Sequence, residues 1–79
     1  MNIKILGSGC SNCRKLYEET LSAVKNLNRD DIQVEYITNI SVALSYGIMS
    51  TPALLINDKA VSQGRVLRAS EIETLILKN

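Results

Sequence analysis

The chain has 79 residues, of which 46% are hydrophobic and 22% are charged. This composition is typical of one globular domain over residues 1–79, and it excludes both a second hydrophobic core and an intrinsically disordered chain. A net charge of +1 and only three aromatic residues, all tyrosines, argue against nucleic-acid binding, which needs a basic surface or stacking rings.

No apolar run approaches the ~20 residues that a membrane-spanning helix needs. The N-terminus lacks the basic and apolar segments of a signal peptide, although a mature form trimmed of its signal would look the same. We therefore expect no membrane association and a cytoplasmic location. In a reducing compartment, two closely spaced cysteines are more often catalytic or metal-binding than structural.

The first half of the chain predicts a strand followed by a helix. Residues 2–6 form an apolar run typical of a buried strand, and Gly7 and Gly9 then allow a sharp turn. A helix from Ser11 to about Leu27 is predicted because apolar residues recur at the spacing of one helix face. These residues are Leu16, Tyr17, Leu21, Val24 and Leu27, with Cys13 on the same face.

A polar turn separates this helix from a second strand. Residues 32–36 alternate between apolar and polar side chains, which is the period of a strand with one buried face. Thr38 or Asn39 is suited to cap a short helix that runs through Tyr46, and Gly47 is suited to end it in a left-handed conformation.

The last third predicts a hairpin and a terminal helix. Residues 53–56 and 60–63 are expected to be strands joined by a turn at 57–59. Gly64 is expected to break the second strand, in the form of a bulge. Ser70 and Glu73 match a capping box, and the helix that follows would turn Ile72, Leu75 and Ile76 inward.

The predicted order is therefore β-α-β-α-β-β-α, an α/β fold. The first β-α-β unit requires a right-handed crossover and a parallel strand pair, whereas the hairpin requires an antiparallel pair. A four-stranded mixed sheet with helices on both faces, in three layers, follows from this order.

The chemistry of the chain centres on Cys10 and Cys13, which are its only cysteines. Their C-x-x-C spacing places the first sulfur at a helix N-terminus, where unpaired N–H groups and the helix dipole lower the pKa of a thiol from its usual ~8.5. Cys13 can donate a hydrogen bond from one turn away, and Arg14 and Lys15 add positive charge nearby. We expect Cys10 to attack a substrate disulfide and Cys13 to resolve the mixed disulfide.

Three other interpretations of the cysteine pair remain open. A purely structural disulfide would close a very short ring and so stabilise the fold little. A structural zinc site needs four Cys or His ligands, and this chain has two cysteines and no histidine. Two thiolates can bind Cu(I), as in a metallochaperone-like domain with the order β-α-β-β-α-β. The pair can also gate the binding of a partner without turnover.

With the cysteine pair, the element order and Thr51-Pro52 ahead of a strand, the chain resembles the thioredoxin superfamily. It is most similar to the small thioredoxin-like or glutaredoxin-like redox-active disulfide proteins of archaea and bacteria, over essentially its whole length. The resemblance implies a thioredoxin-like fold, with Cys10 as the exposed nucleophile and Cys13 as the buried resolving thiol. It also implies a cis bond at Thr51-Pro52, in a loop that offers its backbone to the substrate.

The function implied by this resemblance is a thiol–disulfide oxidoreductase that reduces protein disulfides in electron transport. Ser11, Asn12, Thr51 and Pro52 are then candidates for substrate binding, and no cofactor or metal is expected. The implied partners are disulfide-containing proteins and an electron donor of the thioredoxin-reductase type, with the chain acting as a monomer.

The sequence also departs from the family pattern. Ser11-Asn12 is neither the Gly-Pro of typical thioredoxins nor the Pro-Tyr of typical glutaredoxins, and Gly9 replaces the thioredoxin tryptophan. The first strand carries no acid, and Gly64 has no second glycine for glutathione. Ile48 and Met49 are candidates either for an apolar docking rim or for the core.

Overall fold

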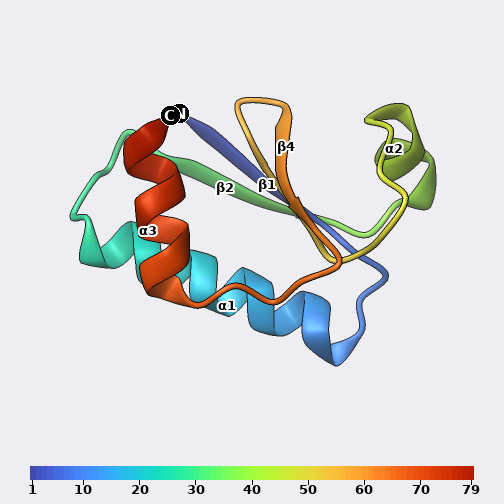
Figure 1. Ribbon diagram of the computed structural model, residues 1–79, viewed down its shortest axis with the longest axis horizontal. Coiled ribbons are helices and arrows are strands. Elements are labelled where there is room, and N and C mark those ends of the chain that lie inside the picture. The colour runs from blue at the N-terminus through green and yellow to red at the C-terminus, as the bar shows by residue number, and fades with distance from the viewer.

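The computed structural model describes all 79 residues and has the predicted order of elements (Figure 1). These elements are β1 (Asn2–Leu6), α1 (Ser11–Asn26), β2 (Gln33–Ile37), α2 (Ile40–Ser45), β3 (Ala53–Ile56), β4 (Lys59–Gln63) and α3 (Ala69–Lys78). None of the helices combines the length and the apolar character that crossing a membrane requires.

The four strands form one mixed sheet in the order β2-β1-β3-β4. β1 pairs in parallel with β2, and β3 is antiparallel to β4, as predicted. β3 is also antiparallel to β1, its other neighbour in the sheet. At the end of β1, Leu6 lies between Ile37 of β2 and Ala53 of β3. The turn after β1, the turn after β2 and the loop before β3 therefore meet at one end of the sheet.

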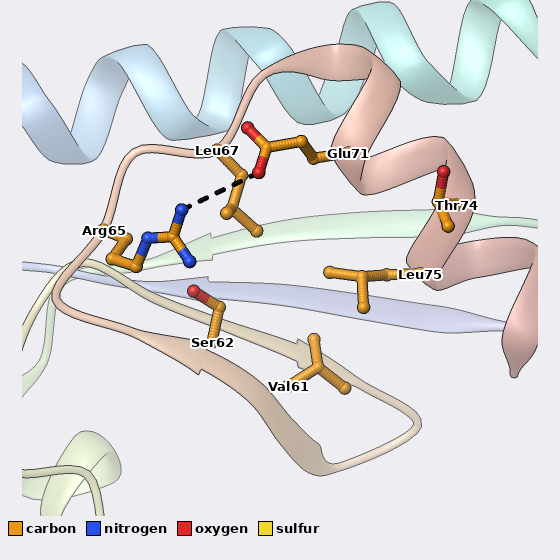
Figure 2. A pocket seen from close by; sticks show the side chains of 7 residues that line it. All are labelled: Val61, Ser62, Arg65, Leu67, Glu71, Thr74 and Leu75. Atoms are coloured by element: carbon orange, nitrogen blue, oxygen red, sulfur yellow. Dashed lines mark ion pairs between the residues drawn. The ribbon is translucent and has the colours of Figure 1, made fainter.

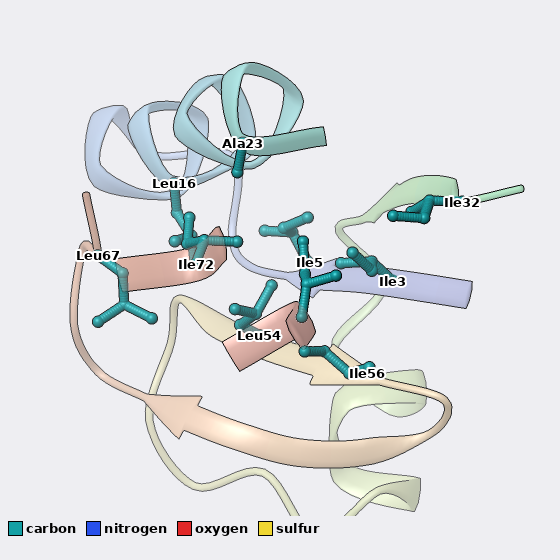
Figure 3. Packing of buried hydrophobic residues seen from close by; sticks show 10 residues of the cluster. Ile3, Ile5, Leu16, Ala23, Ile32, Leu54, Ile56, Leu67 and Ile72 are labelled. Atoms are coloured by element: carbon teal, nitrogen blue, oxygen red, sulfur yellow. The ribbon is translucent and has the colours of Figure 1, made fainter. Parts of the chain in front are cut away.

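The larger part of the core lies between the sheet and the helices α1 and α3. Figure 3 shows Leu16 of α1 and Ile72 of α3 among the sheet residues Ile5 and Leu54. The cluster consists of Ile3, Ile5, Leu16, Ala23, Ile32, Leu54, Ile56, Leu67, Ile72 and Ile76. This packing confirms Ile72 and Ile76 as inward residues of the last helix.

A second core cluster joins the short helix α2 to the sheet. It contains Leu6, Ala43, Ile48, Ala53 and Leu55. Because neighbouring residues of a strand point to opposite faces, Leu6 and Leu55 face α2 while Ile5 and Leu54 face α1. The three predicted layers are therefore present.

The buried face of α1 differs from the predicted face. Leu21 is 43% exposed, whereas Thr20 is fully buried. Thr20 is tolerated there because its hydroxyl donates a hydrogen bond to the carbonyl oxygen of Leu16 at 2.8 Å. Helix α1 packs against both the sheet and α3, so the middle of its buried face is turned away from Leu21.

The predicted capping box at Ser70 and Glu73 is wrong. Helix α3 begins at Ala69, so Ser70 lies inside its first turn. The carboxylate of Glu71 accepts a hydrogen bond from the Arg68 N–H at 3.1 Å, and the carboxylate of Glu19 on α1 accepts one from the Ala69 N–H at 3.0 Å. A residue from another helix thus supplies part of the cap, which local sequence patterns do not reveal.

The hairpin between β3 and β4 has a tighter turn than predicted. Only Asn57 and Asp58 form it, both with positive φ, and Lys59 belongs to β4. The bulge is not at Gly64. Leu54 pairs with Ser62 and Leu55 with Ala60, so β4 has one extra residue between Ala60 and Ser62. Gly64 does end the strand, as predicted, because β4 stops at Gln63.

Candidate active site

Cys10 and Cys13 lie at the start of α1, where Cys10 is the N-cap residue. Cys10 is exposed and Cys13 is completely buried, and both are free thiols. Their Sγ atoms are 3.0 Å apart, so the two thiols are in hydrogen-bond contact. The Cys10 residue is therefore accessible to solvent, while the Cys13 sulfur is buried and in contact with the Cys10 sulfur.

The turn before the cysteines uses its two glycines for different reasons. Gly7 is buried, and a Cβ atom at this position would lie 2.6 Å from the Cβ atom of Cys13. Gly9 has a φ of +84° with open space around it, so it provides the left-handed backbone of the turn. Gly7 is thus needed for close approach to Cys13 and Gly9 for the turn itself.

Hydrogen bonds lower the pKa of Cys10 to about 7 from an ordinary value of 9.0. The largest effect comes from the Cys13 thiol, followed by the Cys13 backbone N–H and the Ser8 side chain, while burial opposes the shift. The predicted help from Arg14 and Lys15 is not among the main causes. Both side chains are exposed, where water screens their charge.

Thr51 and Pro52 lie beside the turn that carries the cysteines. Their peptide bond is cis, the geometry that the resemblance implies. Pro52 is buried and its carbonyl oxygen accepts a hydrogen bond from the Gly64 N–H at 2.8 Å, while Thr51 is exposed. Because Leu6 pairs with Ala53, Gly7 and Pro52 continue from neighbouring ends of β1 and β3.

A hollow of about 180 Å³ opens between these segments. Its lining comes from the turn after β1, the start of α2 and the loop before β3, through Gly7, Ser8, Thr38, Ile40, Ala43 and Thr51. The sequence did not point to Ile40 as a residue of the site, because only the fold brings α2 to this end of the sheet. Ser11 and Asn12 are exposed on the first turn of α1.

Ile48 and Met49, which were candidates for one apolar rim, have different environments. Ile48 is buried in the core under α2, and Met49 is 92% exposed. The Met49 N–H donates to the side-chain oxygen of Gln63 at 3.1 Å, which holds its backbone while its side chain faces solvent. Ile40 and Leu44 of α2 are further exposed apolar residues.

A larger cavity of about 330 Å³ lies away from the cysteines, between β4 and α3 (Figure 2). Arg65 and Glu71 form an ion pair across its mouth at 3.7 Å, so Arg65 is engaged within the chain. The lining residues are Val61, Ser62, Arg65, Leu67, Glu71, Thr74 and Leu75, and they include no thiol nucleophile. The cysteine pair is the better candidate for an active site.

The fold disagrees with the metallochaperone-like alternative. That arrangement ends on a strand, whereas this chain ends on α3. No third Cys, Asp or Glu joins the two thiols in a group that could hold a metal ion.

Comparison with known proteins agrees with this geometry. A family model described as a thioredoxin domain matches residues 1–77. The chain belongs to the thioredoxin family. It is similar to a thioredoxin of Methanothermobacter thermautotrophicus, with 33% identity over 76 residues that cover 96% of this chain and 97% of the relative. It is also similar to a thioredoxin of Methanocaldococcus jannaschii, with 28% identity over 71 residues, 90% of this chain and 80% of the relative.

Membership of the thioredoxin family supports thiol–disulfide oxidoreductase chemistry in general. The arrangement of the cysteines suits that chemistry, since a thiolate must reach solvent and a second thiol must reach the first. Gly9 stands where the thioredoxin pattern has a tryptophan, and Ser8 beside it contributes a hydrogen bond to Cys10.

Proposed function

We propose that this chain reduces disulfide bonds in other proteins, with Cys10 as the nucleophile and Cys13 as the resolving thiol. The observation that carries the proposal is the contact at 3.0 Å between an exposed sulfur and a fully buried one. Only the exposed sulfur can meet a protein substrate, and only the buried one is protected from competing reactions.

In the first step, the Cys10 thiolate attacks one sulfur of the substrate disulfide. A bond forms between Cys10 and that sulfur, and the other substrate sulfur leaves as a thiolate and takes up a proton. A pKa of about 7 makes roughly half of Cys10 thiolate at neutral pH. It also makes Cys10 a better leaving group, so that formation of the mixed disulfide is more readily reversible.

In the second step, Cys13 loses its proton and attacks the Cys10 sulfur. The Cys10–Cys13 disulfide forms, and the second substrate sulfur leaves as a thiolate that takes up a proton. The substrate thus gains two electrons and two protons. A donor of the thioredoxin-reductase type would return two electrons to the Cys10–Cys13 disulfide.

Substrate binding is assigned to Ser11, Asn12, Thr51 and Pro52. Support comes from the exposure of Ser11 and Asn12 between the cysteines and from Thr51 at the edge of the hollow. An extended substrate segment can pair with the backbone of Thr51 as an added strand would. We further propose that the chain acts in the cytoplasm as a monomer.

The proposal is tested by the reduction of insulin in the presence of dithiothreitol. We expect catalysis by the wild type, no catalysis by Cys10→Ser, and a stable mixed disulfide in Cys13→Ser. Mass spectrometry of the trapped species should locate the bond on Cys10. Bonds found only on Cys13 would reverse the two roles.

One control variant and two further measurements distinguish catalytic turnover from other functions of the cysteine pair. Ser45→Ala, on the exposed side of α2, should leave the rate unchanged because it touches neither cysteine. A protein that cycles between dithiol and disulfide in glutathione or dithiothreitol buffers, yet reduces no protein disulfide, would instead be a redox-gated adaptor. Tight Cu(I) binding without turnover would support metal transfer.

A further inference from the structure

Tyr36 carries a hydroxyl group that no role described above explains. Its ring stacks on that of Tyr17 with centroids 5.2 Å apart, and its hydroxyl is buried with no hydrogen-bond partner. A buried polar group without a partner destabilises a fold, so a phenylalanine would pack equally well here at no such cost. We therefore expect the Tyr36 hydroxyl to have a hydrogen-bond partner in another state of the protein.

The position of Tyr36 in the sheet brings it close to the resolving thiol. Tyr36 pairs with Ile5 on β1, and both pack in the core under α1. Gly7 lies two residues beyond Ile5 on the same face, directly against Cys13. Tyr17, the stacking partner, lies one turn after Cys13 on α1. The Tyr36 ring is thus held beneath the first turns of α1.

The charges around the hydroxyl show that it is a donor at neutral pH. Burial raises the pKa of Tyr36, and negative charge on Cys13 and then on Cys10 raises it further, while Arg14 opposes the shift. The group consequently stays protonated at neutral pH. It can donate a hydrogen bond to a thiolate but cannot take up the proton of Cys13.

We propose that the Tyr36 hydroxyl donates a hydrogen bond to the Cys13 thiolate, directly or through one water molecule, during the resolving step. The role rests on the proposed function, because only that reaction moves the negative charge onto Cys13. In the reduced protein the charge resides on Cys10, and the hydroxyl is unpartnered. Once Cys10 is in a mixed disulfide, Cys13 must ionise inside the protein, and β1 carries no acid or other charged group facing it on that side.

The electron balance of the step is unchanged by Tyr36. The Cys13 proton leaves to solvent, the Cys13 thiolate forms a bond to the Cys10 sulfur, and the bond from Cys10 to the substrate sulfur breaks. Tyr36 keeps its own proton throughout. It lowers the free energy of the charged intermediate by a charge-assisted hydrogen bond.

Stopped-flow reaction with 5,5′-dithiobis(2-nitrobenzoate) separates the two steps. Reduced protein releases a first thionitrobenzoate when Cys10 attacks and a second when Cys13 resolves. Tyr36→Phe keeps the ring and removes only the hydroxyl. We expect an unchanged first phase and a second phase slowed about 10-fold at pH 7, the size of a hydrogen bond to a charged group.

Tyr17→Phe is the matched control, because it removes a hydroxyl from the other ring of the same stack. It should leave both phases unchanged. Wild-type rates for Tyr36→Phe, equal slowing of both phases, or an equal effect of Tyr17→Phe would each overturn the proposal. A lower Tm for Tyr36→Phe would also count against it, since an unpartnered hydroxyl should not stabilise the reduced protein.

A second measurement does not depend on any disulfide substrate. In a Cys10→Ala background, the ¹³C shift of the Cys13 β-carbon reports the ionisation of that thiol. Adding Tyr36→Phe should lower the ionisation constant of Cys13 about 10-fold. An unchanged constant would refute the hydrogen bond even if the chain reduces insulin, whereas a lowered constant without insulin reduction would reject only the proposed function.

Discussion

A Cβ atom at Gly7 would lie 2.6 Å from the Cβ atom of Cys13, and closer still to its sulfur. The end of β1 and the first turn of α1 therefore pack together without a side chain between them. This contact buries Cys13 and holds it behind Cys10. It makes position 7 a direct test of how the fold sets the cysteine geometry.

Gly7→Ala should destabilise the protein by about 1–3 kcal/mol, because the added methyl group overpacks a buried contact. It should also push Cys13 away from Cys10 and raise the pKa of Cys10, measured by the pH dependence of iodoacetamide alkylation. Gly47→Ala is the control: its φ of +74° disfavours alanine, but an added Cβ atom there would have no neighbour, and so no cysteine, within 4 Å. It should lose stability and keep the wild-type pKa of Cys10. An unaltered pKa in Gly7→Ala would contradict the packing argument.

The lowered pKa of Cys10 predicts a pH dependence of stability. Since the folded protein holds this pKa at about 7 rather than 9.0, ionised Cys10 favours folding. Its contribution should be full above about pH 9, decrease as the pH falls, and vanish below about pH 7. Urea denaturation of reduced wild type and Cys10→Ser at pH 6, 8 and 9.5 measures it. A difference that grows toward low pH would have the wrong sign.

Ser8 should tune the same thiol more weakly than Cys13 does. Ser8→Ala removes a hydrogen bond from the Cys10 sulfur, whereas Cys13→Ala removes the largest one. We expect Ser8→Ala to slow alkylation of Cys10 at pH 7 by roughly two-fold, through a smaller thiolate fraction. Lys15→Ala, which removes an exposed charge, should change the rate less. A larger effect of Lys15→Ala would show that nearby positive charge outweighs the Ser8 hydrogen bond.

Asp58 joins the hairpin to the end of α2 through Lys4 and Tyr46. The Lys4 ammonium donates to the Asp58 carboxylate at 2.5 Å and to the Tyr46 hydroxyl at 2.8 Å. The Tyr46 hydroxyl in turn donates to Asp58 at 2.9 Å. This cluster ties three elements together on the α2 face of the sheet.

Asp58→Asn should lower the Tm by a few degrees at pH 7 because Lys4 then keeps only Tyr46 as a partner. Lys4 and then Tyr46 lower the pKa of the Asp58 carboxyl, so its stabilising effect is present at neutral pH and is lost as the pH falls through its folded-state pKa. Wild type and variant should converge in acid. Asp31→Asn is the control, since the carboxylate of Asp31 accepts its hydrogen bonds from Arg29, only two residues away. Equal losses from both variants would show that the cluster adds nothing beyond a surface pair.

The corrected start of α3 can be tested at two positions. Glu71→Ala removes the acceptor of the Arg68 N–H and should cost about 1 kcal/mol. Ser70→Ala should have little effect, because Ser70 lies inside the helix and does not cap it. Thermal melts of the two variants decide between the predicted cap and the observed one. A larger loss from Ser70→Ala would support the sequence-based prediction.

The amino-acid sequence by itself predicted the order of elements, the parallel pair β1–β2, the antiparallel hairpin β3–β4 and the cysteine pair at the start of α1. These features depend on periods of two and 3.6 residues and on the spacing of two cysteines, all of which are local. The N-cap of α2 was also predicted from the sequence, as Thr38 or Asn39. In the structure the Asn39 side chain accepts a hydrogen bond from the Ser41 N–H at 2.9 Å.

Only the tertiary structure decided which side chains meet across elements. Glu19 caps α3, Leu21 is exposed, Ile48 is buried while Met49 is not, and Tyr36 lies beneath the helix that carries Cys13. Each of these relationships depends on the register of the sheet and on the rotation of helices against it. Those quantities are set by the packing of all elements at once, and no single segment of the sequence contains them.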